Sequence, residues 1–313
     1  MVLLFIIDPP EGLKAYKDTT VAMMRAAQAR GHAVFVCGQE ALHWAKNSAA
    51  AVATRLSLTD NDEDWYRSHE SLERPLREFD AVLMRKDPPF DLEYVVSTWL
   101  LSAAVREGAH VFNAPDAIRD HNEKLSIAEF APFVAPTLVS REPARLQAFI
   151  DEHRDVVVKR LDVMGGENIF RVRADDPNRN VIVEIMSQAG SRTVMAQRFI
   201  PQIAEGDKRV LLIDGKLVPH CLARIPKAGE SRGNLAAGAR GEAQAVSLRH
   251  REIAAAVGPR LAARGLLLVG LDVIGDWLTE VNVTSPTCFR EIQDQTGFDV
   301  AGMFMDALES KIG

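Results

Sequence analysis

The sequence contains few cysteines, and their positions exclude two kinds of site. Only three occur among the 313 residues, at Cys37, Cys221 and Cys288. Because they are odd in number and far apart, they provide neither a disulfide framework nor the close spacing of metal ligands. A reducing cytoplasm is therefore the expected compartment.

Long apolar runs and basic clusters are also missing. No stretch approaches the ~20 consecutive apolar residues that span a bilayer, and the apolar residues 2–7 are followed by Asp8 and two prolines, unlike a signal peptide. Lys and Arg number 37 against 43 Asp and Glu, for a net charge of -6. This balance disfavours nucleic acids and membranes as partners and favours small molecules.

Two common nucleotide-binding motifs are absent as well. The sequence has no Walker A loop, and no GxGxxG motif follows the first apolar run. These absences disfavour a P-loop NTPase and a nicotinamide-dependent dehydrogenase. At 313 residues the chain is nevertheless long enough for two or three packed subdomains.

Residues 1–122 are predicted to form a parallel α/β domain. Apolar, β-branched runs alternate there with segments of helical periodicity. Asp18 or Thr19 is expected to cap the first helix, and Gly31 to end it. The other predicted elements are strands at 2–8, 32–38, 81–85 and 110–113, a helix at 93–107, and a surface loop with a helix at 59–74.

The pattern changes after residue 122. Residues 123–201 are predicted to form a small antiparallel lobe around a glycine turn. Residues 202–313 are predicted to form a third unit of α+β type. Its expected elements are a hairpin with its turn at Asp214 and Gly215, a helix at 247–264 and a second hairpin at 266–283.

The second hairpin carries the most informative residues. Glu280 and Asn282 lie two positions apart on a predicted strand, so both side chains point to one face. Asp272, on the preceding strand, shares that face only if the loop has an odd number of residues. We predict a three-residue loop at 275–277, which places Asp272 opposite Glu280, because a two-residue turn would place it on the other face.

Such a cluster of oxygen donors suits magnesium ions that also bind nucleotide phosphates. The alternative is that these residues form the solvated face of an antiparallel sheet.

A second segment supports the nucleotide interpretation. Lys159 ends an apolar strand, and Gly165 and Gly166 lie in the following turn, where backbone N–H groups can approach phosphate oxygens. An ordinary tight turn is the alternative there.

Two arginines and a loop complete the candidate site. Arg209 and Arg224 lie on predicted strands, where their guanidinium groups could stabilise a phosphoryl-transfer state or an oxyanion; structural ion pairs are the alternative. Residues 226–242 are rich in Gly, Ala and Ser and are expected to form a mobile loop that closes over the reaction. A plain surface connection is the alternative.

Six ordered segments carry a resemblance to a known family. They are residues 83–90 (LMRKDPPF), 113–125 (NAPDAIRDHNEKL), 206–210 (GDKRV), 221–226 (CLARIP), 232–242 (RGNLAAGARGE) and 269–286 (VGLDVIGDWLTEVNVTSP). Together they resemble the ATP-grasp superfamily, and closely resemble the bacterial glutathione synthetases. This resemblance implies a Rossmann-like substrate-binding domain at 1–122, an ATP-grasp lid subdomain at 123–201 and an ATP-grasp catalytic subdomain at 202–313.

The resemblance also implies roles for individual residues. Metal-binding roles fall on Asp272, Glu280 and Asn282, reaction-centre roles on Arg209 and Arg224, and ATP-binding roles on Lys124, Lys159, Gly165, Gly166, Gln197, Arg198, Phe199, Ile200 and Asn234. The strand at 197–200 would carry adenine, and the loop at 226–240 would cover the active site. Magnesium, with manganese as the alternative ion, would accompany ATP.

The implied reaction joins glycine to γ-glutamylcysteine. ATP would phosphorylate the cysteinyl carboxylate, and the glycine amine would then displace phosphate. Because no protein nucleophile is required, neither Cys288 nor His220 is given a catalytic role. Thr19, Thr20 and Arg85 are candidates for holding the γ-glutamyl group, and a homotetramer is expected because the family is commonly tetrameric.

Two departures from the family pattern affect these expectations. Arg160 and Val163 replace a usual proline and glycine after the lid lysine, which predicts a stiffer lid with an extra charge, and Ala239 replaces a usual glycine. The shared residues also fit another ATP-grasp carboxylate–amine ligase, such as a D-alanine–D-alanine ligase, or a non-catalytic ATP-binding regulator. The likeness at 85–90 (RKDPPF) and 232–238 (RGNLAAG) favours glutathione synthesis.

Overall fold

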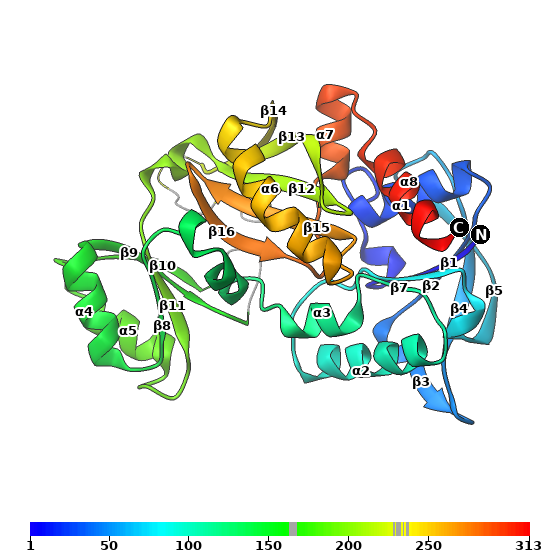
Figure 1. The fold of residues 1–313 in the computed structure, drawn as a ribbon, viewed down its shortest axis with the longest axis horizontal. Coiled ribbons are helices and arrows are strands. Elements are labelled where there is room, and N and C mark those ends of the chain that lie inside the picture. The colour runs from blue at the N-terminus through cyan, green and yellow to red at the C-terminus, as the bar shows by residue number, and fades with distance from the viewer. Residues whose placement is uncertain (163–167, 228, 230–232, 234, 236–237) are drawn as a thin grey trace.

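The computed structural model describes residues 1–162, 168–227, 229, 233, 235 and 238–313. Its strands form three sheets that follow one another along the longest axis of the molecule (Figure 1). The N-terminal sheet lies at one end, together with both chain termini, and the small lid sheet lies at the other. Within the described ranges, no helix combines the length and apolar composition that a bilayer span requires.

The N-terminal part forms a seven-stranded sheet between helices. Its elements are β1 (Val2–Ile6), α1 (Thr19–Ala29), β2 (Ala33–Cys37), β3 (Leu42–Ala45), β4 (Ser48–Leu58), β5 (Tyr66–Pro75), β6 (Ala81–Met84), α2 (Leu92–Arg106), β7 (Val111–Phe112) and α3 (Pro115–Asp120). The strand order is β3-β4-β2-β1-β6-β7, with β5 paired to β4. Strands β1, β2, β6 and β7 are parallel, as predicted, whereas β3, β4 and β5 are antiparallel.

Strand β1 is buried on both faces of this sheet. Alternate residues of a strand point to opposite faces, so Leu4 shares a hydrophobic cluster with Tyr94 of α2, and Phe5 shares another with Met23 of α1. Asp18 caps α1 through its side chain, as one of the two predicted alternatives. The predicted parallel α/β domain is therefore present, and its helices cover both faces of the central strands.

The prediction of a surface loop and helix at 59–74 is correct only for the loop at 59–65, because the rest is a strand and not a helix. Residues 66–75 form β5, which pairs along β4 in a long antiparallel ribbon. The side chains of β5 are mostly exposed on both faces, including Leu72. Because neither face is buried, the segment lacks the apolar alternation by which half-buried strands are recognised.

The lid lobe is a small sheet covered by two helices. Its elements are β8 (Thr137–Ser140), α4 (Pro143–His153), β9 (Asp155–Arg160), β10 (Ile169–Arg173), α5 (Arg179–Ser187) and β11 (Val194–Arg198). All pairs in the order β10-β9-β11-β8 are antiparallel, as predicted. A separate cluster that includes Leu146, Val158 and Val183 forms its core.

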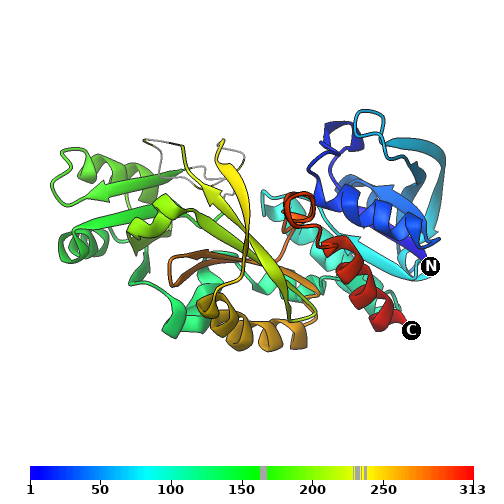
Figure 2. The same ribbon diagram turned by 90° about the horizontal axis from the view of Figure 1, so that it is seen from above.

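The third sheet lies between the other two, and helix α6 covers one of its faces (Figures 1 and 2). Its elements are β12 (Asp207–Ile213), β13 (Lys216–Ile225), β14 (Arg240–Ala245), α6 (Leu248–Ala263), β15 (Leu268–Ile274) and β16 (Trp277–Asn282), followed by α7 (Phe289–Thr296) and α8 (Val300–Ile312). The order is β14-β13-β12-β15-β16, antiparallel throughout. The final helix α8 returns to pack against α1.

The hairpin of β15 and β16 differs from its prediction in one respect. Ile274 pairs with Trp277, so the turn has two residues, and the predicted three-residue loop is wrong. A register shift between Asp272 and Val273 nevertheless brings Asp272 opposite Glu280. A bulge of this kind adds one residue to a single strand, and so restores the shared face that an even loop alone would remove.

Candidate active site

One face of the third sheet carries a continuous row of polar side chains. In the register of the sheet, Asp207 on β12 lies opposite Arg224 on β13, and Arg209 on β12 lies opposite Asp272 on β15. Asp272 also lies opposite Glu280 on β16. Directly paired residues of an antiparallel sheet share a face, and so do residues two apart on one strand. The row therefore crosses four strands, opposite the face covered by α6.

Close ion pairs connect the middle of this row. Arg209 Nε lies 2.6 Å from Asp272 Oδ1, and Arg224 Nη2 lies 2.9 Å from Asp272 Oδ2. All three side chains are buried. Burial alone would raise the pKa of Asp272, but the two guanidinium groups lower it below its usual range. The anionic form of Asp272 is thus favoured, and its carboxylate holds both predicted reaction-centre arginines in place.

Asp207 is a member of this cluster that the sequence analysis did not assign. Its Oδ2 lies 2.5 Å from Arg224 Nη2. Burial raises its pKa to about 7, although Arg224 pulls the pKa down. The signal was present in the sequence, because Asp207 lies two residues before Arg209 on the same strand and so shares its face.

Two buried polar atoms in the cluster are unsatisfied. Arg224 Nε and Asp207 Oδ1 have no hydrogen-bond partner among the residues that the structure describes. Leaving a buried charged group incompletely paired costs free energy. A spare guanidinium N–H at this position can donate to an anionic oxygen, such as one of a phosphate or of a tetrahedral intermediate.

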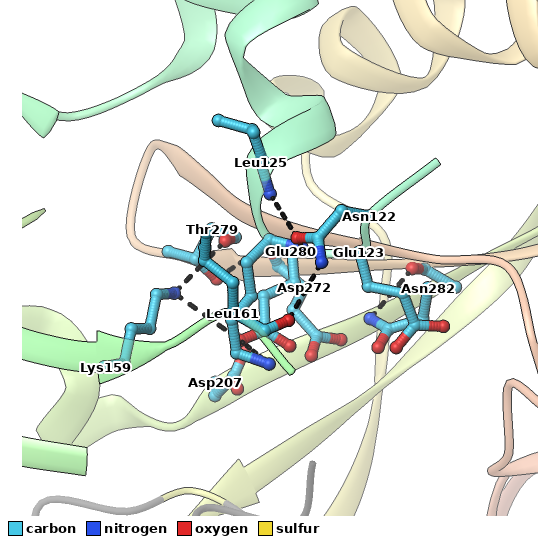
Figure 3. A network of polar contacts seen from close by, with 12 residues as sticks. Asn122, Glu123, Leu125, Lys159, Leu161, Asp207, Asp272, Thr279, Glu280 and Asn282 are labelled. Atoms are coloured by element: carbon cyan, nitrogen blue, oxygen red, sulfur yellow. Dashed lines mark hydrogen bonds and ion pairs between the residues drawn. The ribbon is translucent and has the colours of Figure 1, made fainter. Parts of the chain in front are cut away.

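The two predicted ATP lysines reach the same row from other parts of the fold. Lys159, on β9 of the lid sheet, points toward Glu280 and places Nζ 3.4 Å from Glu280 Oε1 (Figure 3). Lys124, which follows α3, places Nζ 3.8 Å from the same oxygen. Both lysines are buried. Burial lowers the pKa of Lys159, partly offset by Glu280. The structure therefore gathers two ammonium groups and a carboxylate between the lid and the third sheet.

Glu123 is a second residue that the sequence analysis did not assign. Its Oε1 accepts hydrogen bonds from Val283 N at 3.0 Å, and from Thr284 N at 3.1 Å and Oγ1 at 2.8 Å. Burial raises its pKa even though these bonds lower it. Beside it, Asn122 donates to Leu161 O at 2.9 Å. This segment therefore ties the lid to the end of β16 and fixes the adjoining Lys124.

A surface pocket adjoins this segment. Glu123 and Lys124 form part of its wall, together with residues from the segment before α2, from α3, from the lid and from the chain after β16. The lining residues are Pro88, Phe90, Arg119, His121, Asn122, Glu123, Lys124, Leu161, Asp162 and Thr284. One side of Lys124 therefore faces a pocket, while its ammonium group approaches Glu280.

The donor set on β16 fits a magnesium ion that shares its ligands with a nucleotide. Glu280 supplies a carboxylate that is partly exposed, and Asn282 uses Nδ2 to donate to Gly270 O at 3.1 Å, which leaves its carbonyl oxygen as an acceptor. No group of three or more His, Cys, Asp or Glu side chains forms a metal site within the described ranges. Magnesium commonly uses one or two protein oxygens together with phosphates and water, so this small set is sufficient.

The predicted adenine strand lies at the junction of the lid with the third sheet. Gln197 and Arg198 end β11, and Phe199 and Ile200 follow it. Gln197 is buried and donates to Thr137 Oγ1 at 3.0 Å. The guanidinium group of Arg171 stacks on the Phe199 ring. The predicted residues Gly165, Gly166 and Asn234, the replaced position Val163, and part of the loop at 226–240 lie outside the described residues.

Three candidates in the N-terminal part lie beside the chain that follows β16. Arg85 Nε donates to Thr20 Oγ1 at 3.0 Å, and its Nη2 donates to Pro286 O at 2.9 Å. Thr19 Oγ1 accepts from Phe289 N at 3.2 Å. All three candidates are buried and bonded within the protein, which suits residues that position a site.

Comparisons with known proteins agree with the resemblance found in the sequence. Residues 1–119 match the family model for the prokaryotic glutathione synthetase N-terminal domain, and residues 123–297 match the model for the ATP-grasp domain of the same family. A glutathione synthetase of Ralstonia nicotianae is 60% identical, over 100% of this chain and 97% of the relative. One of Nitrosomonas europaea is 54% identical, over 100% of this chain and 98% of the relative.

Solved structures show the same fold at low sequence identity. The D-cycloserine synthetase DcsG aligns with a TM-score of 0.71 and 16% identity over 100% of both chains. The ATP-grasp ligase PsnB, complexed with minimal precursor, Mg and ADP, aligns with a TM-score of 0.61 and 18% identity over 99% of this chain and 98% of that one. These likenesses confirm the predicted fold, and with the family matches they show that the chain belongs to the prokaryotic glutathione synthetase family of ATP-dependent carboxylate–amine ligases.

Proposed function

We propose that this chain joins glycine to γ-glutamylcysteine, with ATP and magnesium, at the polar row of the third sheet. The observation that carries this proposal is the convergence of Lys124 and Lys159 within 4 Å of Glu280 Oε1. Three separate parts of the chain thereby meet where the phosphates of ATP need positive charge and a bound cation needs an anionic ligand.

Each residue has a distinct role in this proposal. Lys124 and Lys159 bind the phosphates of ATP, and Glu280 and Asn282, with Asp272 beside them, hold magnesium, which would neutralise charge on the transferred phosphoryl group. Residues 197–200 bind adenine. The glycines at 165–166, Asn234 and the rest of the loop at 226–240 belong to the lid and cover, as the family resemblance implies.

The two arginines act on the reacting atoms. The cysteinyl carboxylate attacks the γ-phosphorus of ATP, the bond to ADP breaks, and an acyl phosphate forms. The glycine amine then attacks the acyl carbon, and phosphate leaves as the amine loses its proton. Arg209 and Arg224 donate to the oxygens that gain charge in both steps, and Asp272 holds these guanidinium groups in position. Arg224 suits this role because its buried Nε is unsatisfied.

The test is ADP release by the purified protein with ATP and magnesium. Release should be strong with γ-glutamylcysteine plus glycine, weak with either alone, and weak with paired D-alanine, and mass spectrometry should detect glutathione. Release with only another acceptor pair would support a different ATP-grasp ligase. ATP binding without release for any pair would support a non-catalytic regulator.

We also propose a cytoplasmic homotetramer, with 1–122, 123–201 and 202–313 as its structural divisions. All three cysteines are free and buried, which suits a reducing compartment. The N-terminal sheet exposes large apolar side chains such as Trp44 and Val52, which could contribute to contacts between subunits. Light scattering on the purified protein would give the oligomeric state.

A further inference from the structure

An acid–base pair lies at the carboxyl edge of the N-terminal sheet. Asp8 follows β1 by two residues and Lys86 follows β6 by two, and the ends of these neighbouring parallel strands are in register. Lys86 Nζ lies 2.7 Å from Asp8 Oδ1, and both side chains are partly exposed. Ligands of open parallel sheets commonly bind at this edge.

Short connections join this pair to the reacting centre. Asp87 accepts a hydrogen bond from the Ser285 hydroxyl, and its backbone N–H donates to Asp8 Oδ2 at 2.9 Å. Ser285 lies three residues after Asn282, a stretch of at most about 10 Å in an extended chain. The acid–base pair is therefore held beside the segment that leaves the polar row.

The proposed substrate has charged groups that match this arrangement. The γ-glutamyl end of γ-glutamylcysteine carries an α-ammonium and an α-carboxylate on one carbon, and the reacting cysteinyl carboxylate lies about 8 Å away in an extended molecule. A carboxylate and an ammonium side by side can exchange their mutual contact for two contacts to such a zwitterion. Few other substituents would satisfy both charges at once.

Resting on the proposed function, we infer that Asp8 and Lys86 hold the γ-glutamyl end of the substrate. Asp8 accepts hydrogen bonds from the α-ammonium, and Lys86 donates to the α-carboxylate. Neighbouring groups orient the pair, because Lys86 also donates to Asp87 O at 2.8 Å. Buried Arg85, the residue before Lys86, is bonded to Thr20 and Pro286 and so acts as a positioning residue.

The experiment compares three acceptors that differ only at the γ-glutamyl end. They are γ-glutamylcysteine, 4-aminobutanoyl-cysteine, which lacks the α-carboxylate, and glutaryl-cysteine, which lacks the α-amino group. Wild type should prefer the first by about 10- to 100-fold in kcat/KM, the range for one charge-assisted contact. Lys86→Met should lose its preference over 4-aminobutanoyl-cysteine only, and Asp8→Asn should lose its preference over glutaryl-cysteine only.

Control variants separate substrate binding from folding. Lys86→Arg should keep most of the selectivity. Lys311→Met removes a comparable Lys–Asp pair, whose Nζ to Asp214 Oδ1 distance is 2.8 Å, and should behave as wild type. Lys86→Met and Asp8→Asn should both fold normally, because a partly exposed ion pair contributes little to stability. Their KM values for ATP and glycine should stay unchanged, because the inferred contacts are to the γ-glutamyl end alone.

Two results would overturn the inference while leaving the proposed function intact. One is an equal loss of activity toward all three acceptors in both variants, as a purely structural pair would require. The other is a selectivity in both variants equal to that of wild type. A wild-type protein that ignores γ-glutamylcysteine but uses another acceptor would overturn the proposed function itself and this inference with it.

Discussion

Buried charges of opposite sign alternate through the polar row, and this arrangement indicates function more than stability. Asp272 forms ion pairs with Arg209 and Arg224, all three of them buried, and Arg224 also pairs with the partly exposed Asp207. Removing charges from water costs several kcal/mol per ion, and apolar side chains of similar size often stabilise a protein as well or better. A cluster of this kind is therefore best explained by the charge that it presents to a substrate.

Replacing Arg224 tests this interpretation at a single residue. Arg224→Ala should lower turnover by about 10²- to 10³-fold, the usual cost of a lost donor to a developing oxyanion. The KM for ATP should change far less, because the lysines bind the phosphates. Steady-state kinetics would measure both. Arg224→Lys, which keeps the charge but not the forked donors, should fold normally and still lose turnover.

The exposed Arg251 provides a matched control for that substitution. Arg251→Ala should leave both turnover and the KM for ATP unchanged. If Arg224→Lys folds and turns over as fast as wild type, Arg224 has no part in the chemistry.

The raised pKa of Asp207 predicts a dependence of stability on pH. Because burial raises the pKa to about 7 in the folded state, the folded protein binds this proton more tightly than the unfolded chain does, whose pKa is near ~4. The group's contribution to stability is thus fully present below the unfolded pKa, and it is lost as pH rises toward 7. Asp207→Asn cannot titrate, so its free energy of unfolding should decline less over this range.

Urea unfolding at several pH values would measure that difference. Asp306→Asn, at an exposed position of α8, should give a curve parallel to that of wild type. Parallel curves for Asp207→Asn and wild type would show that Asp207 keeps an ordinary pKa in the folded protein.

At the scale of elements, the hairpin of β15 and β16 shows what the sequence could and could not predict. The alternation of Glu280 and Asn282 correctly placed both on one face. The position of Asp272 was also predicted correctly, but through the wrong turn. The bulge depends on local contacts, including a hydrogen bond of 3.1 Å from Thr279 Oγ1 to Asp272 O, which no spacing rule anticipates.

Contacts between residues far apart in the sequence were harder to predict than this hairpin. The pairing of Lys159 on the lid with Glu280 joins residues 121 positions apart, and it was not predicted from the sequence. Strand β5 was missed because its exposed faces carry no apolar period. The parallel strands and capped helices were found because burial and capping leave local patterns in the sequence.

Gly270 provides a test of how closely β15 must approach the arginine beside it. A Cβ atom at this position would lie 2.9 Å from Arg209 Cδ and 3.1 Å from Pro286 Cβ. Gly270→Ala should therefore displace the Arg209 side chain from Asp272 and lower turnover by about 10-fold or more, since a misplacement near 1 Å can cost up to 10²-fold. Kinetics and thermal unfolding would separate this effect from a loss of fold.

Gly12→Ala is the control for that substitution, because a Cβ atom there would meet nothing within 4 Å. It should leave turnover unchanged. Full turnover in Gly270→Ala would show that the site tolerates a shift of Arg209.

At the scale of the whole molecule, the N-terminal part and the third sheet share their hydrophobic cores. Phe5 and Met23 belong to one cluster with Leu211 of β12 and Phe304 of α8. The lid has a cluster of its own. The sequence divides into three units by pattern, but packing unites the first and the third, and leaves the lid as the lobe with the most independent core.

Replacing Phe304 tests this shared core. Phe304→Ala should lower the free energy of unfolding by about 3–5 kcal/mol, the usual cost of removing a buried phenylalanine. Because the cluster is shared, hydrogen exchange should accelerate in α1 as well as in α8, and much less in α4 of the lid. Ile185→Ala, at an exposed position of α5, should change neither stability nor exchange. Acceleration confined to α8 would show that the N-terminal part folds independently. Acceleration in both α1 and α8 would mean that one core holds the carboxyl edge of the N-terminal sheet in place relative to the polar row.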